Sequence, residues 1–222
     1  MSNDILSTDD FTETGPALYP PSSWDERKSP YACTKRTTDI YGSIIGLVVL
    51  SPVIVLAAVL IRLTSRGKIL YSQVRVGKDG KNFEMYKFRT MKIDAEKDSG
   101  PVWACSNDTR LTPVGKFLRQ THIDEIPQFV NVIRGEMSIV GPRPERPAFV
   151  ERFKQEISGY TKRLDVKPGI TGLAQVWHRY DETINDVRIK IKYDILYIRK
   201  VSFWTDVRIL ARTVRVVLTG TK

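Results

Sequence analysis

The chain has 222 residues, of which 41% are hydrophobic, so it is long enough to form one domain with a core. Its 35 Lys and Arg against 25 Asp and Glu give a formal net charge of +10, which calls for nucleic acid, an anionic membrane or a phosphorylated small molecule as partner. Only two cysteines and two histidines are present, which excludes a disulfide-rich scaffold and argues against a zinc site.

The first thirty residues differ in composition from the rest of the chain. They are polar and rich in proline, and acidic residues stand where a signal peptide needs a basic and then an apolar stretch. We therefore expect three regions along the chain: a flexible N-terminal extension at 1–30, a membrane helix at 31–66 and a cytoplasmic globular domain at 67–222.

The membrane helix is predicted from an uncharged run between Ile40 and Ile61. Its 22 residues could cross a hydrocarbon layer of about 30 Å. Ser51-Pro52 interrupts the run, and proline bends a helix while the serine hydroxyl can satisfy a freed carbonyl. Basic residues flank both ends: Lys35, Arg36, Arg62, Arg66 and Lys68. Because such residues favour the cytoplasmic side, a re-entrant helix broken at Ser51-Pro52 is preferred to a simple span, which stays the alternative.

The globular part is predicted to be α+β, mainly helical with a small β-hairpin. Pro142-Arg143-Pro144 predicts a rigid, extended piece. Strands are expected at 69–76 and 82–88, joined by a turn at 77–80. Helices are expected at 112–119, 124–134, 145–157 and 183–199, with a loop at 167–172 and a short strand through 176.

The C-terminal segment from Ser202 onward predicts an amphipathic helix. Basic residues (Arg208, Arg212 and Arg215) fall mostly on another side from the apolar ones, which are Phe203, Trp204, Val207, Leu210, Val214 and Val217. Such a helix suits the plane of a membrane interface. Ordinary packing of the helix on the core is an equally good interpretation.

Two consecutive acidic residues, Asp124 and Glu125, begin the helix expected at 124–134. Acidic side chains there can simply cap backbone amides and complement the helix dipole. They can also form a carboxylate nucleophile with a carboxylate neighbour beside bound anions, and could hold Mg²⁺ through oxygen ligands. Spacing alone leaves both interpretations open.

Candidate anion-binding residues stand beside prolines and glycines. Arg143 lies between two prolines, and Lys167 precedes Pro168-Gly169. Any single cation could be a solvated surface charge, but their repeated placement beside rigid or small residues favours a site for a pyrophosphate with a divalent cation. The candidates are Lys87, Arg89, Arg119, Arg143 and Lys167.

From Lys35 almost to its end, the sequence resembles the bacterial sugar transferases, also called monotopic phosphoglycosyl transferases, in their small catalytic-core form. The motifs that carry the resemblance occur in one order: Lys35-Arg36 with Asp39, Ser51-Pro52, Gln73-x-Arg75-x-Gly77, Lys87-Phe88-Arg89-Thr90-Met91, Asp124-Glu125-x-Pro127-Gln128, the run from Asn131 to Pro144, Lys167-Pro168-Gly169-Ile170-Thr171-Gly172-x-Ala174-Gln175, and Tyr193-Asp194.

The resemblance implies a re-entrant membrane helix and a ping-pong transfer at the cytoplasmic face of the bacterial inner membrane. Asp124 would attack the β-phosphate of a UDP-sugar, release UMP and pass the phosphosugar to polyprenyl phosphate, with undecaprenyl phosphate as the expected acceptor. Glu125 would assist. Mg²⁺, held by Asp124 and Glu125, and the five cations would neutralise the pyrophosphate, with Gln175 also counted among the donor-binding residues.

One stretch departs from the family pattern. Trp177-His178-Arg179-Tyr180-Asp181 replaces an Asn-Gly-Arg-like segment of many members, so the identity of the transferred sugar is left undecided. The sequence also leaves open whether the protein forms a homodimer. A non-catalytic membrane adaptor that binds anionic lipid or a polysaccharide-assembly partner is the alternative function. Nucleic acid is not expected as a partner, because the basic residues surround a membrane segment and proline-fixed loops.

Overall fold

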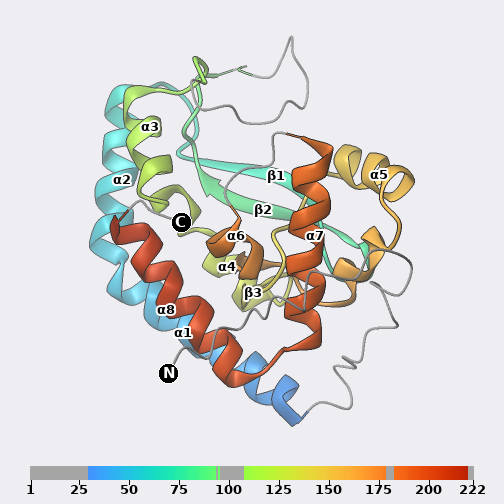
Figure 1. The fold of residues 1–222 in the computed structure, drawn as a ribbon. Coiled ribbons are helices and arrows are strands. Elements are labelled where there is room, and N and C mark those ends of the chain that lie inside the picture. The colour runs from blue at the N-terminus through green and yellow to red at the C-terminus, as the bar shows by residue number, and fades with distance from the viewer. Residues whose placement is uncertain (1–29, 94, 96–107, 179–182, 220–222) are drawn as a thin grey trace.

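The computed structural model describes residues 30–93, 95, 108–178 and 183–219 (Figure 1). The extension expected at 1–30 lies outside them except for Pro30, the first residue of α1. The described chain is mainly helical with two small two-stranded sheets, which confirms the α+β prediction.

The uncharged run forms two helices, α1 (Pro30–Val49) and α2 (Ser51–Thr64), bent by 60° where they meet. Pro52 has no N–H to offer the carbonyl of Val48 four residues earlier, and the Ser51 hydroxyl donates to that carbonyl instead at 2.7 Å. The predicted break at Ser51-Pro52 is therefore confirmed. No single described helix is long and apolar enough to cross a membrane, whereas the bent pair together meets that length and composition.

The predicted hairpin is confirmed as β1 (Leu70–Val76) and β2 (Asn82–Phe88), an antiparallel pair joined through a short 3₁₀ turn, η3 (Lys78–Gly80). Asp79 in that turn has a positive φ of 57°, a conformation that aspartate tolerates better than most residues. The register pairs Tyr71 with Lys87, which fixes the strand position of Lys87.

The helix predicted at 124–134 is divided. After α3 (Pro113–Gln120), which is capped by Thr112, the chain forms a 3₁₀ turn, η4 (Ile123–Glu125), and then α4 (Gln128–Arg134), which ends at Gly135. The prediction of one continuous helix is wrong because Pro127 lacks the N–H that such a helix needs there. The acidic pair consequently sits in the 3₁₀ turn rather than on a regular helix.

A parallel pair, β3 (Ser138–Val140) and β4 (Gly169–Thr171), lies near the centre of the molecule. Between them come α5 (Pro147–Glu156) and the 3₁₀ helix η5 (Tyr160–Asp165). β4 falls within the segment predicted as a loop, and the strand predicted to follow that loop through 176 is instead a short helix, α6 (Leu173–Trp177). Leu173, Ala174 and Val176 are all buried, so the apolar run that predicted a strand fills the core as a helical turn instead.

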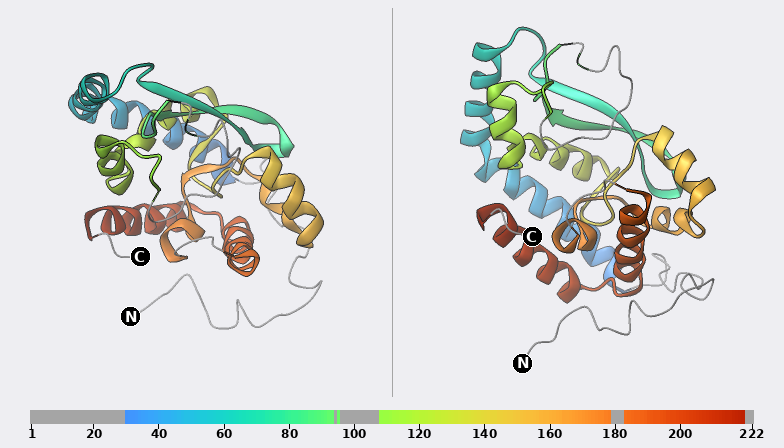
Figure 2. Two further views of the ribbon diagram at one scale, coloured as in Figure 1. Left: turned by 90° about the horizontal axis from the view of Figure 1, so that it is seen from above. Right: turned by 45° about the horizontal axis from the view of Figure 1, so that its top comes forward.

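Two long helices complete the fold: α7 (Ile184–Arg199), which begins with a capping box at Thr183, and α8 (Phe203–Thr219). Tyr197 of α7 and Ile209 of α8 are buried in one core cluster with Val140 of β3. A second cluster joins α2 to α3 and β2 through Ile61, Leu118 and Phe88. In Figures 1 and 2, α2 and α8 lie on the same side of the molecule.

Candidate active site

The acidic pair lies at the end of a sharp turn. His122 adopts a left-handed conformation with φ of 57°, and η4 follows it immediately. Asp124 is only 5% exposed, yet no side-chain cap hydrogen bond is formed at the start of η4 or α4. The acidic pair therefore lies in the first turn of η4 without a side-chain cap hydrogen bond at either helix start.

Glu125 is held by two cations from different parts of the chain. Lys87 on β2 donates to its Oε1 at 2.8 Å, and Arg143 donates Nη2 to Oε1 at 2.5 Å and Nη1 to Oε2 at 3.2 Å. Burial alone would raise the pKa of Glu125, but the charges of Arg143 and Lys87 outweigh it and hold that pKa well below its usual value. Glu125 is thus a carboxylate with its oxygens already committed.

Asp124 has a different environment from its neighbour. Among the contacts of the described residues, no hydrogen bond reaches its carboxylate. Burial raises its pKa to about 6, the Glu125 charge adds to this, and Lys87, Arg119 and Arg143 oppose it. A carboxylate without hydrogen-bond partners among the described residues, which becomes charged just below neutral pH, is suited to act as a nucleophile.

Arg119 completes the cationic surroundings of Asp124. Its Nε donates to the Thr90 hydroxyl at 3.0 Å, and its Nη1 lies 3.9 Å from Asp108 Oδ2. Gly115 allows the close approach of α3 to the strand exit at Thr90, because a Cβ there would lie 1.9 Å from the Thr90 carbonyl oxygen. Lys87, Arg119 and Arg143 are therefore the predicted cations that the structure brings to the acidic pair.

Two other predicted site residues make contacts elsewhere. Arg89 donates through Nη2 to the carbonyl and hydroxyl of Ser65, so it caps the end of α2. Gln175 donates from Nε2 to the Ile170 carbonyl at 2.8 Å, and its buried Oε1 has no partner among the described residues. In the contacts of the described chain, neither side chain reaches the acidic pair.

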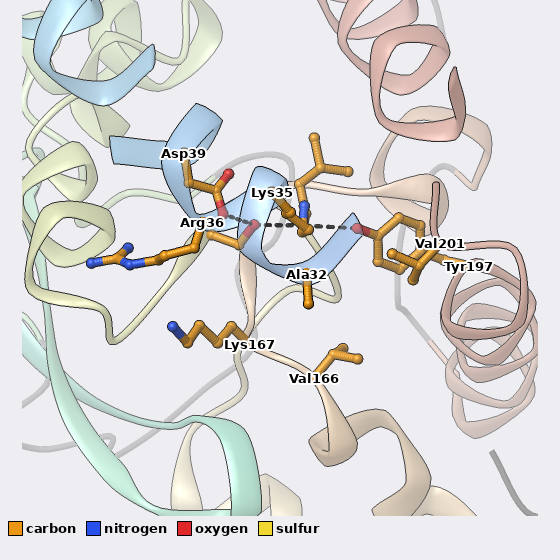
Figure 3. A pocket seen from close by; sticks show the side chains of 10 residues that line it. Ala32, Lys35, Arg36, Asp39, Val166, Lys167, Tyr197 and Val201 are labelled. Atoms are coloured by element: carbon orange, nitrogen blue, oxygen red, sulfur yellow. Dashed lines mark hydrogen bonds between the residues drawn. The ribbon is translucent and has the colours of Figure 1, made fainter. Parts of the chain in front are cut away.

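Lys167 lines a pocket between α1, β3 and the end of α7, shown in Figure 3. Burial and the nearby charges of Arg36, Lys78 and Lys35 lower its pKa. Asp39 on α1 lines the same pocket and accepts from the Ser138 hydroxyl at 2.7 Å. Lys167 thus belongs to an electrostatic environment separate from that of Asp124.

The two basic residues that precede the membrane run fasten α1 to the globular part. Lys35 pairs with Asp206 of α8 at 2.5 Å, and Arg36 donates to the carbonyls of Val132 and Ile133 at 2.6 and 2.9 Å. Arginine is favourable at the last turn of α4 because it donates to carbonyls at the negative end of the helix dipole, and Val132 O accepts from Gly135 N as well. These contacts place the start of α1 on the globular domain.

A metal ion at this site would have few protein ligands. The described residues contain no group of three or more His, Cys, Asp or Glu side chains able to hold a metal. Glu125 has both oxygens on cations, which leaves the Asp124 carboxylate as the ligand that fits. A single carboxylate is compatible with Mg²⁺, which commonly completes its octahedron with substrate phosphates and water.

The sequence interpretation missed Arg163, which donates to the Arg143 carbonyl, and its pairing with Asp194. Their proximity arises only from tertiary folding, because they come from η5 and α7. Asp194 did stand in the Tyr193-Asp194 motif, but no spacing rule links it to Arg143.

Comparison with known proteins gives a consistent family. A family model described as bacterial sugar transferase matches residues 30–220. A UDP-N-acetylgalactosamine-undecaprenyl-phosphate N-acetylgalactosaminephosphotransferase of Aeromonas hydrophila is 46% identical over 190 residues, covering 86% of this chain and 45% of the relative. A UDP-glucose:undecaprenyl-phosphate glucose-1-phosphate transferase of Klebsiella pneumoniae is 45% identical over 182 residues, covering 81% and 39%.

A shorter relative is covered more fully. A UDP-glucose:undecaprenyl-phosphate glucose-1-phosphate transferase of Caulobacter vibrioides is 40% identical over 189 residues, covering 83% of this chain and 70% of the relative. The chain spans less than half the length of the Aeromonas and Klebsiella relatives. The match of the family model across nearly all of the chain after its first 29 residues shows that this protein belongs to the bacterial sugar transferase family.

Proposed function

We propose that this protein transfers a sugar 1-phosphate from a UDP-sugar to undecaprenyl phosphate through a covalent intermediate on Asp124, with release of UMP. The observation that carries the proposal is the contrast within the acidic pair. Asp124 is buried and uncommitted, while Glu125 beside it is fixed by Lys87 and Arg143. The relatives named above supply the class of donor and acceptor.

The first half-reaction uses Asp124 as nucleophile. One of its carboxylate oxygens attacks the β-phosphorus of the donor, and the bond from that phosphorus to the bridging oxygen breaks. UMP leaves with the bridging oxygen and its electron pair, and the phosphosugar stays on Asp124. In the second half-reaction a phosphate oxygen of undecaprenyl phosphate attacks the same phosphorus and frees the carboxylate.

The cations beside Asp124 suit the charge of this reaction. Arg143 and Arg119 keep about a third of their side chains exposed, 33% and 31%, so both can still meet a ligand. Fixed cations in a partly dry site stabilise the charge that develops on phosphoryl oxygens. We propose Mg²⁺ as the cofactor. The Asp124 carboxylate would hold it, and the bound ion would neutralise part of the pyrophosphate charge.

The protein's exposed apolar surface supports a site at a membrane. Large apolar side chains are exposed on α1, α2 and α8, among them Ile45, Val48, Leu56, Leu63 and Trp204. On α8 every apolar residue predicted for the interface is exposed, while Ile209 and Val216 are buried on the opposite side. We propose that the bent pair enters and leaves the bilayer by the cytoplasmic face, with α8 lying at the interface.

The proposal is tested with purified protein in nanodiscs and a panel of UDP-sugars. UMP release that needs Mg²⁺ is expected for at least one donor, and intact-protein mass spectrometry should find the protein heavier by one phosphosugar when no acceptor is present. Asp124→Asn should abolish both signals. Asp165→Asn, which removes an exposed carboxylate, is the matched control and should keep them.

The panel also tests the adaptor alternative. Membrane binding without turnover of any donor would favour that alternative and reject the enzymatic proposal. Normal turnover by Asp124→Asn would reject the assignment of the nucleophile while leaving the transferase activity standing.

A further inference from the structure

The segment that carries Arg143 is held through its carbonyl oxygens. Pro142 and Pro144 have no N–H groups, so this piece of chain has few donors of its own. Four consecutive carbonyls, from residues 142 to 145, nevertheless all accept hydrogen bonds. In chain order their donors are Gly169 N at 2.9 Å, Arg163 Nη2 at 2.8 Å, Arg75 Nη1 at 3.0 Å and Val76 N at 2.9 Å.

The carbonyl of Arg143 itself is bound by Arg163, a side chain that is almost entirely buried. Arg163 is 4% exposed and uses its remaining nitrogens on buried partners. Its Nε donates to Asp194 Oδ2 at 2.9 Å, and its Nη1 donates to the Tyr160 hydroxyl at 3.0 Å. A guanidinium with five N–H groups in a fixed plane can make these contacts at the same time, whereas an ammonium group cannot.

Stability alone does not explain a buried pair of this kind. Removing two charges from water costs about as much as their attraction returns, and an apolar pair of similar volume often serves equally well. Asp194 is 2% exposed, so the pair bears that cost in full. What an apolar pair cannot provide is the hydrogen bond to the Arg143 carbonyl.

From this arrangement we propose that Arg163, held by Asp194, is a positioning residue that keeps Arg143 in place against Glu125. The inference rests on the proposed function, because Arg143 acts beside the nucleophile Asp124. It makes α7 and η5, which contribute no side chain to the acidic pair, part of the active-site scaffold.

The test uses a double substitution that removes the pair and keeps the volume, Arg163→Met with Asp194→Leu. The matched control removes an exposed pair on α5, Arg152→Met with Glu156→Leu. We expect the first variant to fold with an unfolding temperature close to that of the wild type and to lose at least tenfold in kcat for UMP release. The control should lose less than twofold.

A pH profile separates positioning from mere structural damage. If Arg143 is displaced, it no longer opposes the rise in the pKa of Asp124, so the acidic limb of the profile should move to higher pH. Arg163→Lys keeps the charge opposite Asp194 but not the planar fork, and should show a smaller shift in the same direction. If the double variant has the same kcat and the same acidic limb of the pH profile as the wild type, the proposal is overturned.

A measurement without turnover keeps this test independent of the proposed function. Carbodiimide labelling of Asp124 against pH, followed by peptide mass spectrometry, reports its protonation whether or not the protein releases UMP. A labelling midpoint that moves upward in the double variant but not in the control supports the positioning role. Identical midpoints in wild type and double variant overturn it, even if the wild type proves to be an active transferase.

Discussion

Asp124 and Glu125 are consecutive residues of one 3₁₀ turn, yet their carboxyl groups are shifted in opposite directions. Burial raises the pKa of Asp124 to about 6, whereas Arg143 and Lys87 overcome burial at Glu125 and hold its pKa well below the usual value. Environments that separate the pKa values of two adjacent carboxyl groups assign them different roles. We propose accordingly that Glu125 is the permanent anion that fixes the cations and that Asp124 is the group that reacts.

The raised pKa of Asp124 predicts the pH dependence of turnover. A nucleophilic carboxylate must be deprotonated, so kcat/KM for UMP release should fall with decreasing pH through about 6, with a slope that corresponds to one proton. The measurement is initial UMP release from pH 5 to 8 in nanodiscs, with the folded state checked at each pH. A rate that stays level from pH 8 down to pH 5 would contradict the assignment.

Asp124→Asn should stabilise the protein at neutral pH. The folded pKa of Asp124 is raised above its unfolded value, so its favourable contribution is complete below about pH 4 and is lost as pH rises through about 6. Asparagine does not titrate, so the variant keeps its free energy of unfolding as the pH rises. The wild type loses up to about 3 kcal/mol of that free energy by pH 8. The gain in unfolding temperature over wild type should therefore grow between pH 4 and 7. Asp165→Asn should show no such trend.

The neighbours of Asp124 should shift its titration in opposite directions. Lys87 lowers the pKa of Asp124 and Glu125 raises it, so Lys87→Met should move the midpoint to higher pH and Glu125→Gln to lower pH. Lys87→Met removes one of the two cations on Glu125, which keeps Arg143, whereas Glu125→Gln leaves Lys87 and Arg143 without their anion. Each substitution should cost about 2 kcal/mol of stability. Carbodiimide labelling measures both midpoints, and Glu151→Gln, at an exposed ion pair, is the control. Shifts of the same sign in both variants would refute this electrostatic picture.

The sequence predicted the local elements well because their signals are local. The hairpin followed from turn residues between two strand-like runs. The helices expected at 112–119 and 183–199 correspond to α3 and α7, and the structure shows that Thr112 and Thr183 cap them. The two errors had different causes, one local and one tertiary. Pro127 divides the helix expected at 124–134, and the apolar run at 173–177 folds as α6 to fill the core.

The sequence predicted only part of the candidate site, because tertiary folding decides which side chains meet. Asp124, Glu125, Lys87, Arg119 and Arg143 come together, but Arg89 binds Ser65 and Lys167 lines a different pocket. A cation beside a glycine or proline marks a rigid position without saying which way the side chain points. The buried contact of Arg163 with the Arg143 carbonyl spans 20 residues and depends on α7, so no sequence pattern could indicate it.

The bend between α1 and α2 should survive removal of the proline. Pro52→Ala restores a donor for the Val48 carbonyl, a gain of about 1 kcal/mol. Straightening would separate α2 from α3 and undo the packing of Ile61 and Ala57 there, and we expect the lost van der Waals contacts to outweigh that gain. We therefore expect Pro52→Ala alone to keep both ends of the pair on one side of the membrane. Adding Ile61→Ala weakens that packing and should move a fraction of the chains into a spanning state.

Labelling from the cytoplasmic side of the membrane shows whether both ends of the bent pair lie on that side. Cys33 is exposed on α1, and Arg66→Cys marks the chain after α2, with Cys105→Ser removing the other native thiol. In inside-out vesicles an impermeant maleimide should react with both positions in the parent protein and with Pro52→Ala. Loss of labelling at position 66 in Pro52→Ala alone would mean that the proline, rather than packing on α3, maintains the bend.

The lipid contact of α8 can be read from its tryptophan. Trp204 is 69% exposed beside Phe203, whereas Trp177 lies beneath the guanidinium of Arg212, 4.2 Å from its ring centre. If α8 rests in the interface, brominated lipids should quench a protein whose only tryptophan is Trp204, because aromatic side chains there sit at the headgroup level. A protein whose only tryptophan is Trp177 has the same lipid around it and serves as the control, with little quenching expected. Equal quenching of the two would show that membrane proximity is general rather than a property of the exposed face of α8. No quenching of Trp204 would leave α8 as a helix that only packs on the core.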